Sequence, residues 1–154
     1  VEMNAWCDAV LDEISIPQHV RIRTDYLSET TVDIDPDRMH QVLSNLLQNA
    51  HQAAEARFSE EDGGIVTIST RRSGDRFWIT VSDNGPGVPE DIQGQIFDPL
   101  YSTKTYGVGL GLPLVKQVIE DHHGVVSLLN AEEGGAAFRI DLPIKQPKPG
   151  EAAA

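Results

Sequence analysis

The chain has 154 residues, of which 40% are hydrophobic and 23% are charged, and its formal net charge is −12. These values are typical of one globular domain with one core, and the acidic balance argues against nucleic acid as a partner. No apolar run approaches the roughly 20 residues that cross a bilayer, and the single cysteine, Cys7, excludes an internal disulfide. We therefore expect a cytoplasmic domain without direct membrane contact.

The N-terminal part predicts short elements followed by a long helix. Residues 5–14 fit a helix, and residues 19–26 and 31–34 fit strands. Asp35 and Pro36 then mark a helix start, with the aspartate as N-cap and the proline at the first helical position.

The long helix has an apolar face bordered by amides. The apolar residues recur at spacings of three and four: Met39, Val42, Leu43, Leu46, Leu47, Ala50, Ala53 and Ala54. The amides that border this face are Gln41, Asn45, Gln48, Asn49 and Gln52. Amides beside a buried face are expected at the wall of a pocket or in a wet groove.

Two strands follow, at residues 65–71 and 76–82. In the second strand Phe77, Ile79 and Val81 share one face by alternation, and the next residue in that register is Asp83. A carboxylate is therefore expected on the core side, where it needs a donor partner.

The C-terminal part predicts a short helix at residues 88–92, a loop at 98–106 and an amphipathic helix from about Leu110 to the stop signal His123-Gly124. Residues 124–130 and 138–142 fit a final hairpin, and residues 144–154 fit a linker or disordered tail. The expected fold is an α/β (α+β) two-layer sandwich, with a mixed, mostly antiparallel sheet covered on one face by helices.

Asn45 and Asn49 are spaced so that both amides project from one side of the long helix. A neutral amide oxygen can take one position of a Mg²⁺ shell that must also hold phosphates. The alternative is a pair of polar residues on a solvated helix flank.

Asp83 precedes the turn Asn-Gly-Pro-Gly87, whose glycines Gly85 and Gly87 let a ligand approach the backbone. A buried carboxylate can accept a hydrogen bond from an exocyclic amino group and so distinguish adenine from guanine. The alternative is a simple turn at the end of a hairpin.

Gly107, Gly109 and Gly111 precede the second amphipathic helix and leave N–H groups free for phosphate oxygens. A flexible hinge is the alternative. Lys104 could reach distal phosphates as a point charge, although lone loop lysines are usually solvated. The five histidines show no metal-ligand spacing, and we expect most of them on the surface.

Four segments in order resemble the N box, first glycine box, F box and second glycine box of the catalytic, ATP-binding domain of sensor histidine kinases. They are Asn45-Leu-Leu-Gln-Asn49, Asp83-Asn-Gly-Pro-Gly87, Ile96-Phe-Asp-Pro99 and Gly107-Val-Gly-Leu-Gly-Leu112. That superfamily (GHKL, Bergerat fold) also contains gyrase-type topoisomerases, mismatch-repair ATPases and heat-shock chaperones. The resemblance extends from about residue 33 to residue 143, and residues 99–104 are similar to the nitrogen-regulation branch of these kinases.

The resemblance implies roles for individual residues. Asn49 would be the Mg²⁺ ligand with Asn45 beside the phosphates, and Asp83 would read adenine above the turn of Gly85, Gly87 and Val88. Phe97 would anchor a lid. The remaining ATP contacts would come from Thr103, Lys104, Gly107, Val108, Gly109, Leu110, Gly111, Leu112 and Ala136. Asn45, Asn49 and Lys104 would serve phosphoryl transfer.

Three departures from the family pattern stand out. Ala136 occupies a position where serine or threonine is usual, and Gln52 stands where many members have a lysine. No histidine lies in the context of a phosphoacceptor, so the dimerisation domain would be separate. Residues 1–14 would be its trailing helix or a linker, and residues 15–143 the catalytic domain, monomeric in isolation.

The implied function is transfer of the ATP γ-phosphoryl group to a histidine on that dimerisation domain, with a response regulator receiver domain as the downstream partner. One alternative is an ATPase of the same superfamily, but those relatives place a glutamate where this chain has Asn45. A second alternative is a non-catalytic module that senses nucleotide or binds a partner protein, which Ala136 and Gln52 keep open.

Overall fold

A computed structural model describes residues 1–27, 29–58, 63–98, 111–131 and 134–146. Along the chain, the first helix is followed by one strand, and each of the next two helices by a pair of strands. The helices are α1 (Met3–Glu13), α2 (Pro36–Phe58) and α3 (Leu112–Asp121). The strands are β1 (Val20–Tyr26), β2 (Gly64–Ser73), β3 (Arg76–Asp83), β4 (Val125–Asn130) and β5 (Ala136–Pro143).

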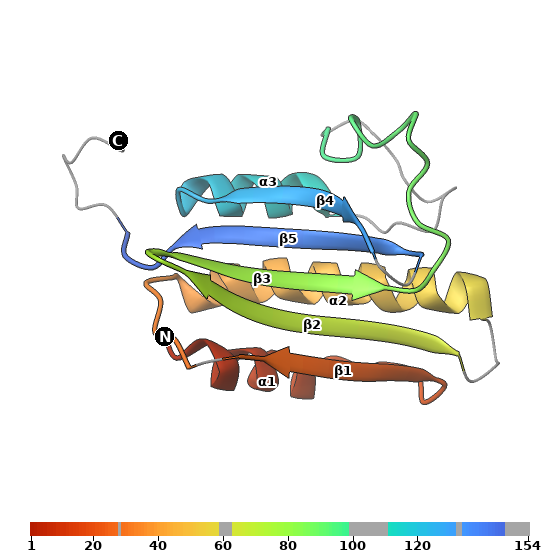
Figure 1. Ribbon diagram of the computed structural model, residues 1–154, viewed down its shortest axis with the longest axis horizontal. Coiled ribbons are helices and arrows are strands. Elements are labelled where there is room, and N and C mark those ends of the chain that lie inside the picture. Colours follow the sequence, from red (N-terminus) through yellow and green to blue (C-terminus); the bar gives the residue numbers. More distant parts are fainter. Residues whose placement is uncertain (28, 59–62, 99–110, 132–133, 147–154) are drawn as a thin grey trace.

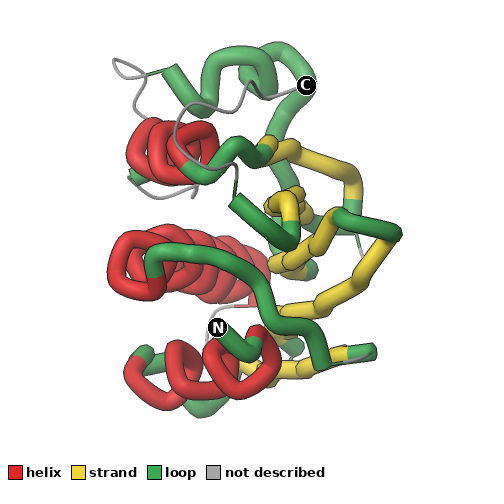
Figure 2. Tube along the Cα trace, turned by 90° about the vertical axis from the view of Figure 1, so that its left-hand side faces the viewer, coloured by secondary structure: helices red, strands yellow, loops and turns green. Residues whose placement is uncertain are grey.

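The strands form one open sheet in the order β1-β2-β3-β5-β4 (Figure 1). Strands β1 and β2 are parallel, and the other three pairings are antiparallel. All three helices lie on the same face of the sheet, so the opposite face carries no helix among the described residues (Figure 2). The predicted two-layer sandwich with a mixed, mostly antiparallel sheet is confirmed.

The core lies between these two layers. The apolar face predicted for α2 is buried along its whole length, from Met39 to Ala54. Strand β3 alternates as expected, with Phe77, Ile79 and Val81 fully buried on the helix side. The apolar face that alternation gives the strand therefore packs against the apolar face that the 3.6-residue period gives the helix.

Two predicted elements are wrong. Residues 31–34 form no strand, since Thr31 makes only an isolated bridge with Glu2. Residues 88–92 are not a helix but the start of successive turns, in which Ile92 N–H donates to the Pro89 carbonyl at 3.1 Å. Gly94, just beyond this segment, disfavours its continuation as a regular helix.

The flanking segments contribute to the fold as well. Met3, Cys7 and Val10 of α1 are buried in the core that α2 and the sheet share. The Ile144 carbonyl accepts a hydrogen bond from Asp33 N–H, and Ile144 packs against the core. The packed unit thus includes α1 and extends past residue 143. The origin of α1 in a dimerisation domain stays a prediction.

Candidate functional site

Helix α2 carries the two asparagines of the candidate site. The Asp35 carboxylate caps the helix by accepting the N–H groups of Asp37 and Arg38 at 3.1 and 3.2 Å, as predicted. Asn49 is only 5% exposed, and its amide nitrogen has no hydrogen-bond partner among the described residues. Because an unpartnered buried amide is costly, this group is available to a ligand.

Asp83 ends strand β3 on the buried face, where the register predicted it, and is 5% exposed. Its Oδ1 accepts the N–H of Gly85 at 2.8 Å and, more weakly, that of Ala136 at 3.4 Å. Neither of these bonds uses Oδ2. Burial raises the pKa of the Asp83 carboxyl to about 6, although the two N–H donors act in the opposite direction.

Asn49 and Asp83 line a common cavity. Its remaining lining residues are Ala53, Gly87, Val88, Ala136 and Phe138. The cavity therefore joins the N-box helix to the first glycine turn and to the start of β5. An apolar wall with a few converging polar groups is typical of a small-molecule site.

Glycines allow the close backbone approaches around this cavity. A Cβ on Gly85 would collide with the Ala53 carbonyl of α2, and Gly87 has a φ of +78°. A Cβ on Gly135 would collide with the backbone and carboxylate of Asp83. These glycines allow the turn after β3 and the segment just before β5 to lie close to Asp83.

The start of α3 meets the N box. Gly111 is the N-cap with a φ of +100°, and a Cβ there would lie 2.6 Å from the Asn45 amide nitrogen. The helix begins at Leu112, whose side chain is buried, close to the start predicted near Leu110. The first turn of α3, whose N–H groups have no intrahelical partner, therefore lies beside Asn45.

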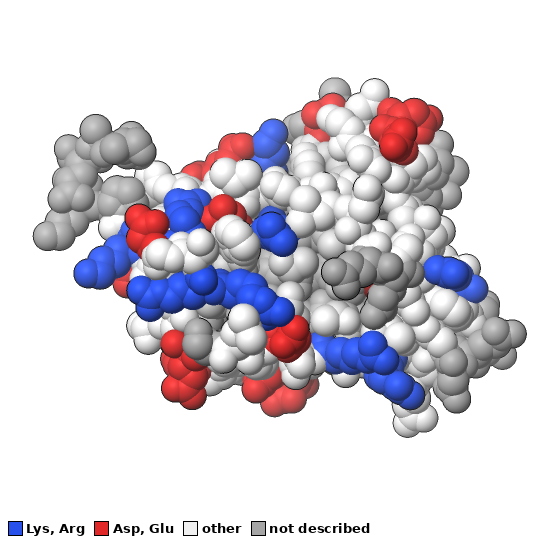
Figure 3. Space-filling model, in the orientation of Figure 1, with Lys and Arg blue, Asp and Glu red and all other residues white. Residues whose placement is uncertain are grey.

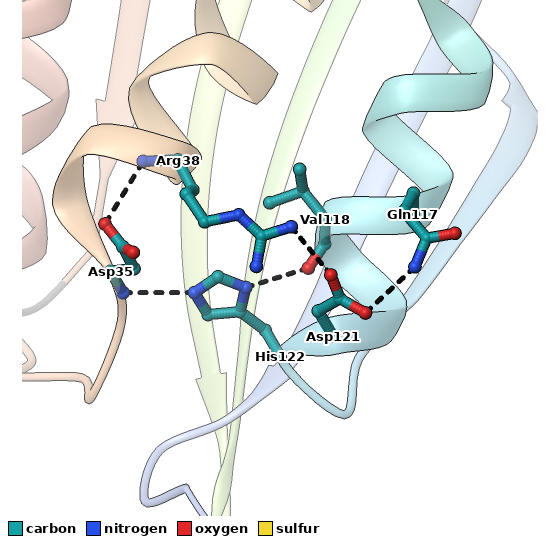
Figure 4. Close-up of polar contacts among 6 residues, drawn as sticks. All are labelled: Asp35, Arg38, Gln117, Val118, Asp121 and His122. Carbon is teal, nitrogen blue, oxygen red and sulfur yellow. Dashed lines mark hydrogen bonds and ion pairs between the residues drawn. The ribbon is translucent and has the colours of Figure 1, made fainter.

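The other end of α3 is fastened to the start of α2 through His122 (Figure 4). Its Nδ1 donates to the Val118 carbonyl at 2.8 Å, and its Nε2 accepts the Asp35 N–H at 3.0 Å. Arg38 of α2 pairs with Asp121 at 2.6 Å beside it. The two hydrogen bonds of the His122 ring require its neutral form with the proton on Nδ1. His122 is the one buried histidine of the five, and it satisfies backbone groups at two helix ends.

Phe97 lies next to the cavity wall. Its ring meets the Phe138 ring edge to face, with 6.1 Å between the centroids. Six predicted site residues lie outside the described part of the chain, namely Thr103, Lys104, Gly107, Val108, Gly109 and Leu110. Their roles stay predictions.

Sequence reasoning missed three residues that build the site. Gly135 was visible only as part of a glycine pair, and its contact with Asp83 joins positions 52 residues apart. Asn84 bonds Ile65 N–H at 2.8 Å and the Gly63 carbonyl at 2.7 Å, which holds the start of β2 beside the end of β3. His122 is the third. These three roles depend on contacts between residues that are distant in the chain, which local sequence patterns do not reveal.

The described residues fit a nucleotide with a divalent cation. Asn49 offers an unpartnered buried amide nitrogen to a phosphate oxygen, and its amide oxygen is the atom that could hold a cation. Asp83 offers a carboxylate oxygen to a base, and Gly111 lets the start of α3 approach Asn45 closely. Within the described ranges, no group of three histidine, cysteine or acidic residues could hold a metal by itself. A cation would then need phosphate oxygens to complete its shell. No helix among the described residues is long and apolar enough to span a membrane.

Comparison with known proteins agrees with this geometry. Residues 34–146 match the family described as histidine kinase-, DNA gyrase B- and HSP90-like ATPase. The sensor histidine kinase ZraS of Salmonella typhi is 41% identical over 114 residues, which are 73% of this chain and 23% of that protein. The adaptive-response sensory kinase SasA of Prochlorococcus marinus is 34% identical over 142 residues, covering 88% and 37%. The chain thus spans about a quarter to two fifths of these relatives.

Solved structures give the same result at the level of the fold. The catalytic domain of histidine kinase ThkA superimposes with a TM-score of 0.81 at 31% identity, covering 94% of each chain. A complex of ThkA with the response regulator TrrA matches with a TM-score of 0.75 at 28% identity, over 94% of this chain and 41% of that one. The chain therefore belongs to the histidine kinase-, DNA gyrase B- and HSP90-like ATPase family, and within it to the catalytic domains of sensor histidine kinases.

Proposed function

We propose that this domain binds Mg²⁺-ATP and delivers the γ-phosphoryl group to a histidine on a separate dimerisation domain of the same protein, as the first step of two-component signalling. The observation that carries the proposal is the cavity shared by Asn49 and Asp83, with Asn45 and the start of α3 beside it. Family membership supports the same reading, and Asn45 replaces the glutamate expected of the ATPase branch.

Each residue has a defined task in this proposal. Asp83 Oδ2 accepts from the exocyclic amino group of adenine, while Gly85 N–H holds Oδ1 in place. Asn49 would hold the cation and Asn45 would face the phosphates. Mg²⁺, when bound, neutralises phosphate charge and orients the transferring group. In this proposal the acceptor histidine is the nucleophile, so positioning and charge stabilisation are the contribution of this domain.

The partners follow from the same proposal. The dimerisation domain would supply the acceptor imidazole, and a response regulator receiver domain would take the phosphoryl group next. ThkA has been solved with a response regulator, which supports the second partner. We place the domain in the cytoplasm, where ATP is available, and residues 99–104 suggest the nitrogen-regulation branch.

A non-catalytic nucleotide-sensing module is the second candidate. It is favoured by Ala136, which is buried at the cavity wall without a hydroxyl, and by Gln52, which is exposed on α2. Both candidates require nucleotide binding, but only the first requires phosphoryl transfer.

Calorimetric titration with a non-hydrolysable ATP analogue, with and without Mg²⁺, tests the shared step. Radiolabelled ATP and a supplied dimerisation domain test transfer. Binding with transfer supports the kinase, and binding without transfer to any supplied dimerisation domain supports the sensing module. Absence of nucleotide binding refutes both.

A further inference from the structure

The outer face of the sheet, opposite the helices, collects positive charge in an acidic protein. Lysine and arginine side chains gather over the strands in the view of Figure 3, which has the orientation of Figure 1. By strand register, the outward positions of β1, β2, β3 and β5 include five arginines. They are Arg21, Arg23, Arg71, Arg76 and Arg139.

Only two acidic residues occupy outward positions of these described strands, Asp25 and Asp141. The outer sheet face therefore has a formal surplus of three positive charges, while the whole chain has a net charge of −12. Such a separation of charge is an electrostatic footprint for a partner of opposite sign.

Some of the arginines are already neutralised within the face and others are not. Arg71 pairs with Asp25 at 2.8 Å, and Arg76 pairs with Asp141 at 2.7 Å. Arg21 and Arg139 have no carboxylate partner among the described residues. These two guanidinium groups are the ones that a partner's carboxylates could engage.

Arg139 lies over the indole of Trp78, with 4.6 Å from its guanidinium carbon to the ring centroid. The Arg139 Nε and the Trp78 Nε1 are both buried without a hydrogen-bond partner among the described residues. A stacked guanidinium keeps its terminal N–H groups directed outward. The pair thus forms a flat platform with donors that the described part of the domain leaves unused.

A shallow groove runs beside this platform. It is lined by short hydroxyl side chains from neighbouring strands, by Arg71 and Arg139, and also by Asp83, which alternation in β3 places on the opposite, buried face. The hydroxyl residues are Thr67, Ser69, Thr80 and Ser82. Hydroxyl donors between two guanidinium groups suit carboxylate oxygens.

We propose that the outer sheet face is a docking surface for an acidic segment of a protein, whose carboxylates engage Arg21 and Arg139 and the hydroxyl groove. An anionic membrane is the less suitable partner, since lipid recognition uses clusters of about four to eight basic residues, two of the five arginines here are already paired with carboxylates, and the rest of this domain is acidic. Nucleic acid is disfavoured for the same reason.

The test uses the full chain carrying Trp6→Phe, so that Trp78 is the remaining one of two tryptophans. A peptide of eight glutamates is titrated at low salt with tryptophan fluorescence as the readout. We expect saturable binding with a change in Trp78 emission, weakened roughly tenfold or more between about 50 and 300 mM salt because exposed charges are screened.

The variant Arg21→Gln/Arg139→Gln should weaken binding by roughly fivefold to thirtyfold, as expected for two partly exposed ion pairs. The matched control Lys116→Gln removes a positive charge from exposed α3 on the other side of the molecule and should leave binding unchanged. Saturating Mg²⁺-ATP should not displace the peptide, since the nucleotide cavity lies on the helix side.

Any of four results would overturn the proposal. The first is no binding of the peptide, and the second is equal binding by the double variant and Lys116→Gln. The third is displacement by nucleotide, and the fourth is a preference for phosphatidylserine vesicles over the peptide.

Discussion

The substitution Asp83→Asn should make the nucleotide-free domain more stable while damaging its binding site. The amide oxygen of the new side chain can still accept the N–H groups of Gly85 and Ala136, so the turn keeps its hydrogen bonds. The substitution removes a carboxylate whose ionised form is disfavoured by burial. It also places an amide donor where the carboxylate oxygen faced the cavity.

The magnitude follows from the pKa of Asp83, which burial raises from 3.8 to about 6. Because the folded state prefers the protonated acid, the stability contributed by this group is full below pH 3.8 and is lost as the pH rises through about 6. At about 1.4 kcal/mol per pKa unit, Asp83→Asn should gain about 2 kcal/mol at pH 5 and about 3 kcal/mol at pH 8.

Urea denaturation of both proteins between pH 5 and pH 8 measures this difference. Asp91→Asn, which removes an exposed carboxylate, is the matched control and should show no comparable gain. A stability difference between Asp83→Asn and the natural chain that is absent, or that does not grow with pH, would refute the burial of an ionisable Asp83.

The same variant tests the adenine contact. Replacing a charged acceptor by a donor should cost about 1.5–3 kcal/mol of nucleotide affinity, or roughly tenfold to 150-fold in Kd. In the natural chain, ATP affinity should also fall by about tenfold between pH 8 and pH 5, because the site takes up a proton near pH 6. Unchanged ATP affinity, or equal affinity for ATP and GTP, would contradict this role.

Further substitutions separate the site from the fold. Gly135→Ala should cost about 1–3 kcal/mol of stability and weaken nucleotide binding by calorimetry, because its Cβ would collide with Asp83, whereas Gly94→Ala meets open space and should do neither. Asn49→Ala should leave the denaturation midpoint nearly unchanged, since the buried amide nitrogen has no partner among the described residues, but should abolish the Mg²⁺ dependence of binding; retained dependence would exclude Asn49 as the ligand. His122→Leu should lower stability by about 1–3 kcal/mol, because the Asp35 N–H and the Val118 carbonyl lose their partner; a loss no larger than that of exposed His123→Asn would show that the link between α2 and α3 is dispensable.

Much of the site could be predicted because it depends on local patterns. The N-cap Asp35 and the apolar spacing define α2 and the side on which Asn45 and Asn49 lie. Alternation in β3 places Asp83 on the buried face. Local prediction fails at residues 88–92. There the structure forms successive turns, in which an N–H group donates to the carbonyl three residues earlier, instead of a helix.

Most helices and strands, the family motifs and the buried carboxylate could be predicted from local patterns, since helix and strand periods are properties of neighbouring residues. The parallel pairing of β1 with β2 and the strand order became visible in the folded structure alone. The same is true of the approach of Gly135 to Asp83, the link from His122 to Asp35 and the arginine-rich outer sheet face. These depend on residues distant in the chain, whose contacts are fixed when the layers pack and each buried polar group finds its partner.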